Sequence, residues 1–228
     1  MTLCLVTDRR RLAGPHAAPD CARRCLVTQM QHAVEAGIDL VQVRERDLEA
    51  SQLSAIVREM IAVARGSSTR VIVNDRLDVA LACGADGVQL RGDSIPVNAA
   101  RRLAPEHFLI GRSVHSVDEA VSAAEADFLV AGTVFPTPSK DGGAPLLGVE
   151  GLRAIVQSAR VPVLAIGGVN EATVVRVART GAAGCAAIGL FMRSDESDGD
   201  GPCRAVPLVA SAQRMRQLFD NNENRSLT

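Results

Sequence analysis

The stretch Val163–Asn170, Val-Leu-Ala-Ile-Gly-Gly-Val-Asn, indicates a buried strand that ends at an anion-binding turn. A strand covered on both faces appears in sequence as a continuous apolar run, as the first half of this stretch does. Gly167 and Gly168 carry no Cβ atom, so the chain can turn sharply there and a ligand can approach the main chain closely. Asn170 is expected to cap a helix that begins at Glu171. Taken alone, the paired glycines fit a tight turn that binds nothing equally well.

A second stretch, Gly184–Phe191, favours the binding interpretation. It is again an apolar run with a glycine at its carboxyl end. In a closed parallel barrel the loops after the last two strands are neighbours, and their main-chain N–H groups commonly hold phosphate. We therefore expect Gly167, Gly168, Ile188 and Gly189 to form one phosphate-binding cup.

The rest of the chain repeats a helix, a stop of small residues and a buried strand, which is the sequence form of alternating strands and helices. Ala50–Ala64 has the apolar spacing of an intervening helix. Right-handed crossovers would close such a series into a (β/α)8 barrel, with residues 1–228 as a single domain. A doubly wound sheet is the runner-up, weakened because no Gly-x-Gly-x-x-Gly motif follows the first strand. The predicted strands are Leu3–Thr7, Leu40–Val43, Val71–Val73, Gly87–Leu90, Phe108–Gly111, Phe128–Val130, Val163–Ile166 and Cys185–Ile188.

The last part of the chain is expected to be less regular. Residues 193–202 are charged and poor in apolar side chains, which predicts a flexible loop. Val206–Phe219 has the pattern of a final helix, and residues 220–228 are expected to fray.

Composition limits the classes of partner. A formal net charge of −1 gives no basic field for nucleic acid, and an aromatic content of 2% argues against base-stacking platforms. No apolar run reaches the roughly 18 residues of a membrane span. The six cysteines are scattered, and neither two close cysteine pairs nor a histidine cluster is present to form a metal site. This predicts free thiols in a reducing cytoplasm. Barrels of this size often pair, so a homodimer is an open expectation.

Polar residues gather at the predicted carboxyl ends of the strands, the edge at which barrel enzymes carry their chemistry. Some have a structural alternative. Arg44 and Arg46 flank Glu45 and could form a solvated ion-pair cluster. Asp75 could cap the next helix, and His115 could bond a backbone carbonyl. The polar residues at these ends are Thr7, Asp8, Gln42, Arg44, Arg46, Asn74, Asp75, Gln89, Arg91, Asp93, Ser113, His115, Thr133, Thr137, Ser139 and Lys140.

These residues belong to an ordered set of motifs. The set is Val6-Thr7-Asp8, Gln42-Val43-Arg44-Glu45-Arg46, Val73-Asn74-Asp75-Arg76, Gly84-Ala85-Asp86-Gly87-Val88, Ser113-Val114-His115, Phe135-Pro136-Thr137-Pro138-Ser139-Lys140 and Ala165-Ile166-Gly167-Gly168-Val169. In this order the motifs resemble the thiamine-phosphate synthase and thiazole tautomerase superfamily of phosphate-binding barrels. The resemblance extends over nearly the whole chain to Phe191, and the ordered set is far more specific than any single motif.

The synthase joins an aminopyrimidine pyrophosphate to a thiazole phosphate and releases pyrophosphate, with Mg²⁺ as cofactor. Pyrophosphate departs readily only if its growing charge is neutralised, which suits arginine, lysine and a hard cation. The resemblance implies that Asp75 ligates Mg²⁺ and that Asn74 contacts the pyrimidine. It implies Arg44, Ser113, His115 and Lys140 as catalytic candidates, and Gln42, Arg44, Arg46, Asn74, Thr137, Ser139, Lys140, Gly167, Gly168, Ile188 and Gly189 as substrate-binding residues.

One loop departs from the synthase pattern, which usually has a His and then Gly-Gln-Glu-Asp after the fourth strand, the last Asp being a second Mg²⁺ ligand. This chain has Gln89-Leu90-Arg91-Gly92-Asp93-Ser94 there. Read without gaps, Ser94 takes the place of that ligand, and Asp93, one residue early, is a weak substitute. Arg91 is an alternative source of positive charge. Arg46 replaces the usual lysine, which keeps the charge and changes its geometry.

Two other functions stay open. The related tautomerase needs no metal and moves a proton on a carboxylated thiazole phosphate, and its acid/base segment resembles Gly111-Arg112-Ser113-Val114-His115-Ser116. An imidazole suits that proton transfer. Asn74-Asp75 together with Thr137-x-Ser139-Lys140 favours the synthase. The third alternative is a non-catalytic barrel that only binds thiazole phosphate, for which the missing second carboxylate would be the first sign.

Overall fold

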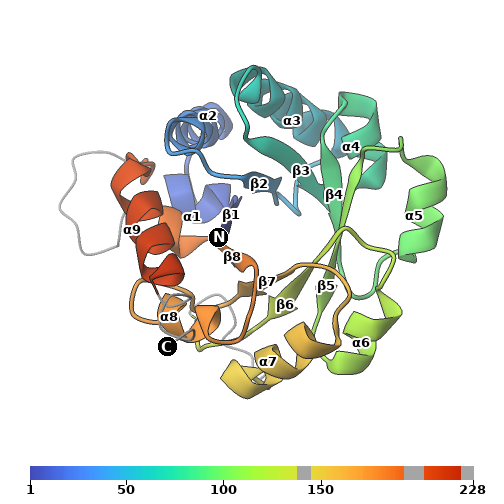
Figure 1. Ribbon diagram of the computed structural model, residues 1–228. Coiled ribbons are helices and arrows are strands. Elements are labelled where there is room, and N and C mark those ends of the chain that lie inside the picture. Colours follow the sequence, from blue (N-terminus) through green and yellow to red (C-terminus); the bar gives the residue numbers. More distant parts are fainter. Residues whose placement is uncertain (138–144, 193–202, 222–228) are drawn as a thin grey trace.

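The computed structural model describes residues 1–137, 145–192 and 203–221. Within them, parallel strands pair in chain order, and β8 pairs back onto β1, so that the sheet closes into a barrel (Figure 1). This is the predicted single-domain (β/α)8 architecture, and the doubly wound alternative is wrong. The strands are β1 (Thr2–Val6), β2 (Leu40–Val43), β3 (Arg70–Asn74), β4 (Gly87–Leu90), β5 (Leu109–Val114), β6 (Phe128–Gly132), β7 (Val163–Ile166) and β8 (Gly184–Ala187).

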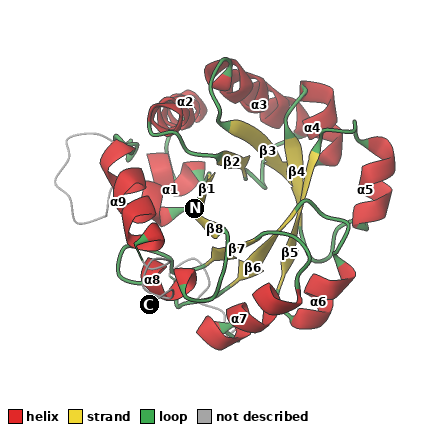
Figure 2. Ribbon diagram, in the orientation of Figure 1, coloured by secondary structure: helices red, strands yellow, loops and turns green. Residues whose placement is uncertain are grey.

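Helices surround the sheet on its outer side, as the ring of red elements around the yellow strands in Figure 2 shows. None of the helices in the described part of the chain has the length and apolar character needed to cross a bilayer. The helices are α1 (Arg9–Ala13), α2 (Pro19–Glu35), α3 (Ala50–Ala64), α4 (Leu77–Cys83), α5 (Val97–Leu103), α6 (Val117–Ser122), α7 (Gly148–Ser158), α8 (Val174–Ala178), the short 3-10 helix η1 (Gly189–Phe191) and α9 (Val209–Asp220).

The strands are buried on both faces, which explains their continuous apolar runs. One face packs under the helices, in a core that contains Leu3, Leu5 and Val41. The other face fills the barrel interior with a separate cluster that includes Val6 and Ile72. Successive side chains of a strand point to opposite faces, so each strand contributes side chains to both clusters. The barrel interior is therefore packed, and the polar groups lie at the ends of the strands.

The predicted bounds of β2, β4, β7 and α3 agree with the structure. The prediction for β5 stopped too early, because the strand continues past Gly111 and pairs with β6 as far as Val114 opposite Ala131. Ser113 therefore lies on the strand itself, and His115 directly follows it.

The predicted helix cap at Asn170 is wrong in position. The helix α8 begins at Val174, and Asn170 instead makes a turn in which its Oδ1 accepts hydrogen bonds from the backbone N–H groups of Ala172 and Thr173. The final helix also starts later than predicted, at Val209. The predicted flexible loop at 193–202 and the frayed tail from 222 onward lie outside the described residues.

Candidate functional site

A cavity of about 1080 Å³ opens at the carboxyl ends of the strands. It is slightly larger than the usual range of small-molecule sites, roughly 300–1,000 Å³. Its wall includes the turns after β7 and β8 and the polar ends of β2 to β5, so the predicted meeting of Gly167 and Gly189 is confirmed. The predicted residues that line it are Gln42, Arg44, Arg46, Asn74, Asp93, Ser113, His115, Thr137, Gly167, Gly168, Ile188 and Gly189.

The wall after β7 consists mainly of main chain. Gly167 and Gly168 have φ angles of 97° and 64°, a region that side chains disfavour. A Cβ atom on Gly168 would lie 2.5 Å from the Pro136 carbonyl oxygen, and one on Gly167 would lie 2.4 Å from the Thr133 side chain. Only glycine fits at either position. The turn after β7 therefore packs closely against the segment after β6, and both of its glycines line the cavity.

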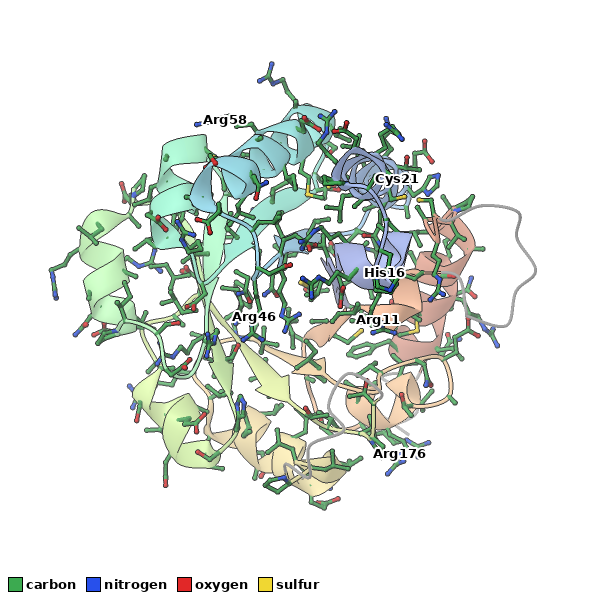
Figure 3. The ribbon with its side chains drawn as sticks, turned by 180° about the vertical axis from the view of Figure 1, so that it is seen from behind. Arg11, His16, Cys21, Arg46, Arg58 and Arg176 are labelled. Carbon is green, nitrogen blue, oxygen red and sulfur yellow. The ribbon has the colours of Figure 1, made fainter. Side chains whose placement is uncertain are left out.

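The wall after β2 consists of charged side chains. Arg44 and Arg46 both line the cavity, and Figure 3, which views the molecule from behind, places Arg46 near the centre of the barrel. Burial lowers the pKa of Arg44, and the neighbouring positive charge of Arg46 lowers it further. Both effects oppose the charged form of Arg44, and a bound polyanion would offset them. Beside these arginines, Gln42 Nε2 donates a 2.9 Å hydrogen bond to Asn74 Oδ1.

Glu45 forms an ion pair, but with Arg9 and not with the flanking Arg44 or Arg46. Glu45 is buried and pairs with Arg9 from α1, with Nη1 and Oε2 3.1 Å apart. Glu45 also accepts a 2.7 Å hydrogen bond from the Thr7 hydroxyl, whose oxygen accepts the Arg44 backbone N–H at 2.9 Å. Arg9 thus neutralises Glu45, while Arg44 lines the cavity.

The loops after β3 and β4 meet at Asp75. Its φ of 61° is left-handed, a strained conformation for a residue with a side chain, and such strain gathers at functional sites. One carboxylate oxygen accepts a hydrogen bond from the Ser94 hydroxyl. The other lies 3.6 Å from an Arg91 guanidinium nitrogen. The predicted helix cap does not form, because Arg76 precedes α4 and makes no side-chain cap.

These residues do not fit a metal site formed by the protein alone. The Asp75 carboxylate is engaged by Ser94 and Arg91, and Asp93 forms a 2.5 Å ion pair with Arg91. Among residues 1–137, 145–192 and 203–221, no three His, Cys, Asp or Glu side chains come together as a metal-binding group. Ser94, in place of a carboxylate, is the reason.

The predicted acid/base segment lies at the end of β5, beside β4, and lines the same cavity. Ser113 accepts a 3.1 Å hydrogen bond from Gln89 Nε2 at the end of β4. His115 is half exposed, and its Nδ1 lies 3.8 Å from the Glu119 carboxylate. Ser116 caps α6 through the Glu119 backbone N–H. Ser113 and His115 therefore face the cavity from the rim after β5.

Some residues of the site were not predicted, and two predicted ones are not described. Arg11 lines the cavity, and its guanidinium lies 3.2 Å from the position that a Cβ atom on Gly189 would take. Its place three residues after the strand-end Asp8, which caps α1, was the available signal. Ser139 and Lys140 lie outside the described residues.

Comparison with known proteins gives the family. The family model described as thiamine monophosphate synthase matches residues 4–191. A thiamine-phosphate synthase of Methanoregula boonei is 47% identical over 158 residues, covering 68% of this chain and 73% of that protein. One of Pyrococcus furiosus is 37% identical over 198 residues, covering 86% of this chain and 89% of that protein.

A solved structure agrees. The thiamine phosphate pyrophosphorylase from Pyrococcus furiosus superposes with a TM-score of 0.77 at 33% identity, over 97% of this chain and 96% of that one. A 3-hexulose-6-phosphate synthase, at 20% identity and a TM-score of 0.62, shares the fold. Motifs, cavity and relatives agree, and the chain belongs to the thiamine monophosphate synthase family.

Proposed function

We propose that the protein is a thiamine-phosphate synthase, a transferase that joins an aminopyrimidine pyrophosphate to a thiazole phosphate and releases pyrophosphate. The observation that carries the proposal is a single cavity with two unlike walls. The glycine turns after β7 and β8 offer main chain to one phosphate group, and Arg44 and Arg46 offer positive charge to a pyrophosphate. Two phosphorylated substrates can thus meet between the two walls.

The proposed binding roles follow from these positions. The main chain of Gly167, Gly168, Ile188 and Gly189 holds the thiazole phosphate. Asn74, aligned by its hydrogen bond from Gln42, contacts the pyrimidine. Thr137 lines the cavity and contacts the reacting groups. Ser139 and Lys140 keep the substrate-binding roles that the resemblance implies, and they lie outside the described residues.

The reaction is a substitution at the carbon that links the pyrimidine to its pyrophosphate. The carbon–oxygen bond breaks and its electron pair stays on the pyrophosphate oxygen, while the thiazole nitrogen supplies the pair for the new carbon–nitrogen bond. No base is needed for this attack. The catalytic work is therefore to stabilise negative charge on the leaving group, and Arg44 and Arg46 are placed for it, since preorganised charge is worth most in a site closed to water.

Mg²⁺ enters the proposal as an ion that arrives with the pyrophosphate. Mg²⁺ is commonly bound by one or two carboxylates together with substrate phosphates, and it neutralises charge on them. Asp75 is the carboxylate that would contribute. Asp93, the weaker second candidate, forms an ion pair with Arg91.

Activity with both thiamine precursors, with and without Mg²⁺, tests the proposal directly. Formation of thiamine phosphate and pyrophosphate supports the synthase. Binding of thiazole phosphate without turnover would support the non-catalytic alternative.

The tautomerase remains the second candidate because Ser113 and His115 both line the cavity. If the protein is a tautomerase, the His115→Ala variant should lose conversion of the carboxylated thiazole phosphate in EDTA. If it is a synthase, that variant should retain most coupling activity, because the half-exposed imidazole has no proton to transfer in the reaction above.

We also propose a cellular compartment and an oligomeric state for the protein. The six cysteines are free, which supports a reducing cytoplasm. A homodimer is proposed, and light scattering on the purified protein distinguishes it from a monomer.

A further inference from the structure

Arg91 occupies an unusual position at the edge of the cavity. Its guanidinium lies between two carboxylates, 3.6 Å from Asp75 and 2.5 Å from Asp93. It lines the same cavity as Arg44 and Arg46. Two carboxylates converging on one position in a phosphate site are the arrangement expected around a metal ion. Here a protein cation lies between them.

A compact turn fixes the start of this side chain. The Arg91 backbone N–H donates a 2.9 Å hydrogen bond to the Ser94 hydroxyl oxygen, and the Ser94 backbone N–H donates to the Arg91 carbonyl at 3.1 Å. The same Ser94 hydroxyl donates to Asp75. Asp75 is anchored in turn, because its backbone N–H donates a 2.9 Å hydrogen bond to the Gln89 carbonyl. Ser94 thus joins the Arg91 turn to the Asp75 turn, which an aspartate at position 94 would not do.

Arg91 is also close enough to the other arginines to act with them. Its charge is among those that lower the pKa of Arg44, after burial and the charge of Arg46. Arg44, Arg46 and Arg91 line one cavity, so a ligand with several negative charges is attracted by all three guanidinium groups. Inorganic pyrophosphate and pyrophosphate esters have that chemistry.

We propose that Arg91 binds the pyrophosphate group directly. Its positive charge takes the place of a metal ion that a second carboxylate would otherwise bind. Pyrophosphate therefore binds without Mg²⁺. The inference rests on the proposed function, because it assigns the pyrophosphate to this wall of the cavity. A guanidinium presents parallel N–H donors that match two phosphate oxygens, and such charge-assisted bonds are among the strongest in proteins. Asp75 and Asp93 orient the guanidinium and hold it in place before the ligand binds.

The role also bears on the reaction. Negative charge on the pyrophosphate grows as the carbon–oxygen bond breaks, so a fixed guanidinium stabilises the transition state more than the bound substrate. Arg91 is therefore a binding and charge-stabilising residue of the coupling step.

The direct test is calorimetric binding of inorganic pyrophosphate in the presence of EDTA. The wild-type protein should bind, and the Arg91→Gln variant should bind roughly tenfold or more weakly, because a hydrogen-bonded ion pair is removed. Arg76→Gln is the matched control. Arg76 is a neighbouring arginine that pairs with exposed Asp78 instead of lining the cavity, so its loss should leave binding unchanged. Absence of wild-type binding in EDTA, or equal binding by wild type and Arg91→Gln, would overturn the inference.

Two further variants separate a charge effect from a folding effect. Arg91→Lys keeps the charge and should recover part of the binding that Arg91→Gln loses. The double variant Arg91→Gly with Ser94→Asp removes the guanidinium and restores a second carboxylate beside Asp75. Its pyrophosphate binding should be lost in EDTA and regained with Mg²⁺. Binding by the double variant that ignores Mg²⁺ would count against the exchange of a metal for Arg91.

Failure of this inference is distinguishable from failure of the proposed function. If coupling proceeds with Mg²⁺ but pyrophosphate does not bind in EDTA, the synthase stands and Arg91 has no such role. If pyrophosphate binds through Arg91 but both precursors give no thiamine phosphate, the binding site stands and the proposed reaction is wrong.

Discussion

The two walls of the cavity differ in what they offer to an anion. The wall after β7 has main chain at Gly167 and Gly168, where the geometry excludes any side chain. The wall after β2, β3 and β4 has charged and polar side chains, several of them joined by hydrogen bonds. A backbone site depends on shape and tolerates no added atom. A side-chain site depends on charge, and under our proposal one cation, Arg91, can take the place of another.

The largest expected effect is on the backbone wall. Gly168→Ala should destabilise the protein by about 2–4 kcal/mol, from left-handed strain and the clash with the Pro136 carbonyl, and should abolish thiazole phosphate binding. Gly84→Ala is the matched control. Its φ of 69° is close to the 64° of Gly168, but an added Cβ atom meets nothing within 4 Å. Urea unfolding should show a cost of only about 1–2 kcal/mol there. If both substitutions lower the free energy of unfolding equally, the clash with the Pro136 carbonyl does not contribute to the effect at Gly168.

Arg44→Gln tests the charged wall. It should lower kcat by about 100- to 1,000-fold, because a fixed charge aimed at the leaving group is lost. Thiazole phosphate binding, measured by calorimetry, should stay close to that of the wild type, since it belongs to the other wall. A variant that loses both together would show that the two walls are not separate.

Asp75→Asn gives a smaller effect on the same wall. Asparagine tolerates the left-handed backbone at this position, so the change removes charge with little strain. Coupling should fall by roughly tenfold, as expected for the loss of one charged hydrogen-bonding partner. Steady-state rates at several Mg²⁺ concentrations measure it, and unchanged rates would refute the role of Asp75.

The smallest effect concerns the pH dependence of stability. Burial raises the pKa of Glu45 above its ordinary value of 4.5. The folded protein therefore keeps this proton to a higher pH than the unfolded chain does. The stabilising contribution is present below pH 4.5 and is lost as the pH rises through the folded-state pKa.

Glu45→Gln removes that titration. The free energy of unfolding of the wild type relative to the variant should decline with rising pH across this window and then level off. Urea titrations at a series of pH values measure the difference. A difference that rises with pH would mean that Arg9 outweighs burial at this carboxyl group. Gly84→Ala should keep the wild-type pH dependence, since it touches no ionisable group.

The fold was predictable because each strand is a local apolar run bounded by small residues. A short stretch of sequence was therefore enough to locate β2, β4 and β7. The meeting of the turns after β7 and β8 at one cavity was predictable for a similar reason, since glycine after a buried strand is a local signal. The pairing of Glu45 with Arg9 was not, because it joins residues far apart in the sequence across two loops. Asn170 misled because an Asx turn and a helix cap use the same side-chain oxygen.

The loop after β4 lies between these cases. The replacement of a carboxylate by Ser94 is evident in the sequence, whereas the direction of Arg91 depends on how the loops after β3 and β4 meet. That contact exists only in the folded barrel.

The Thr7 hydroxyl connects the cavity residue Arg44 to the outside of the molecule. It donates to Glu45 and accepts from the Arg44 backbone, and Glu45 is held by Arg9, which also pairs with the partly exposed Asp47. If Arg44 acts on the leaving group as proposed, a substitution at Asp47, on the outside of the molecule, should alter turnover without touching a substrate. Kinetic surveys of this protein should include such outlying positions, because the surface residue Asp47 is only four contacts away from Arg44.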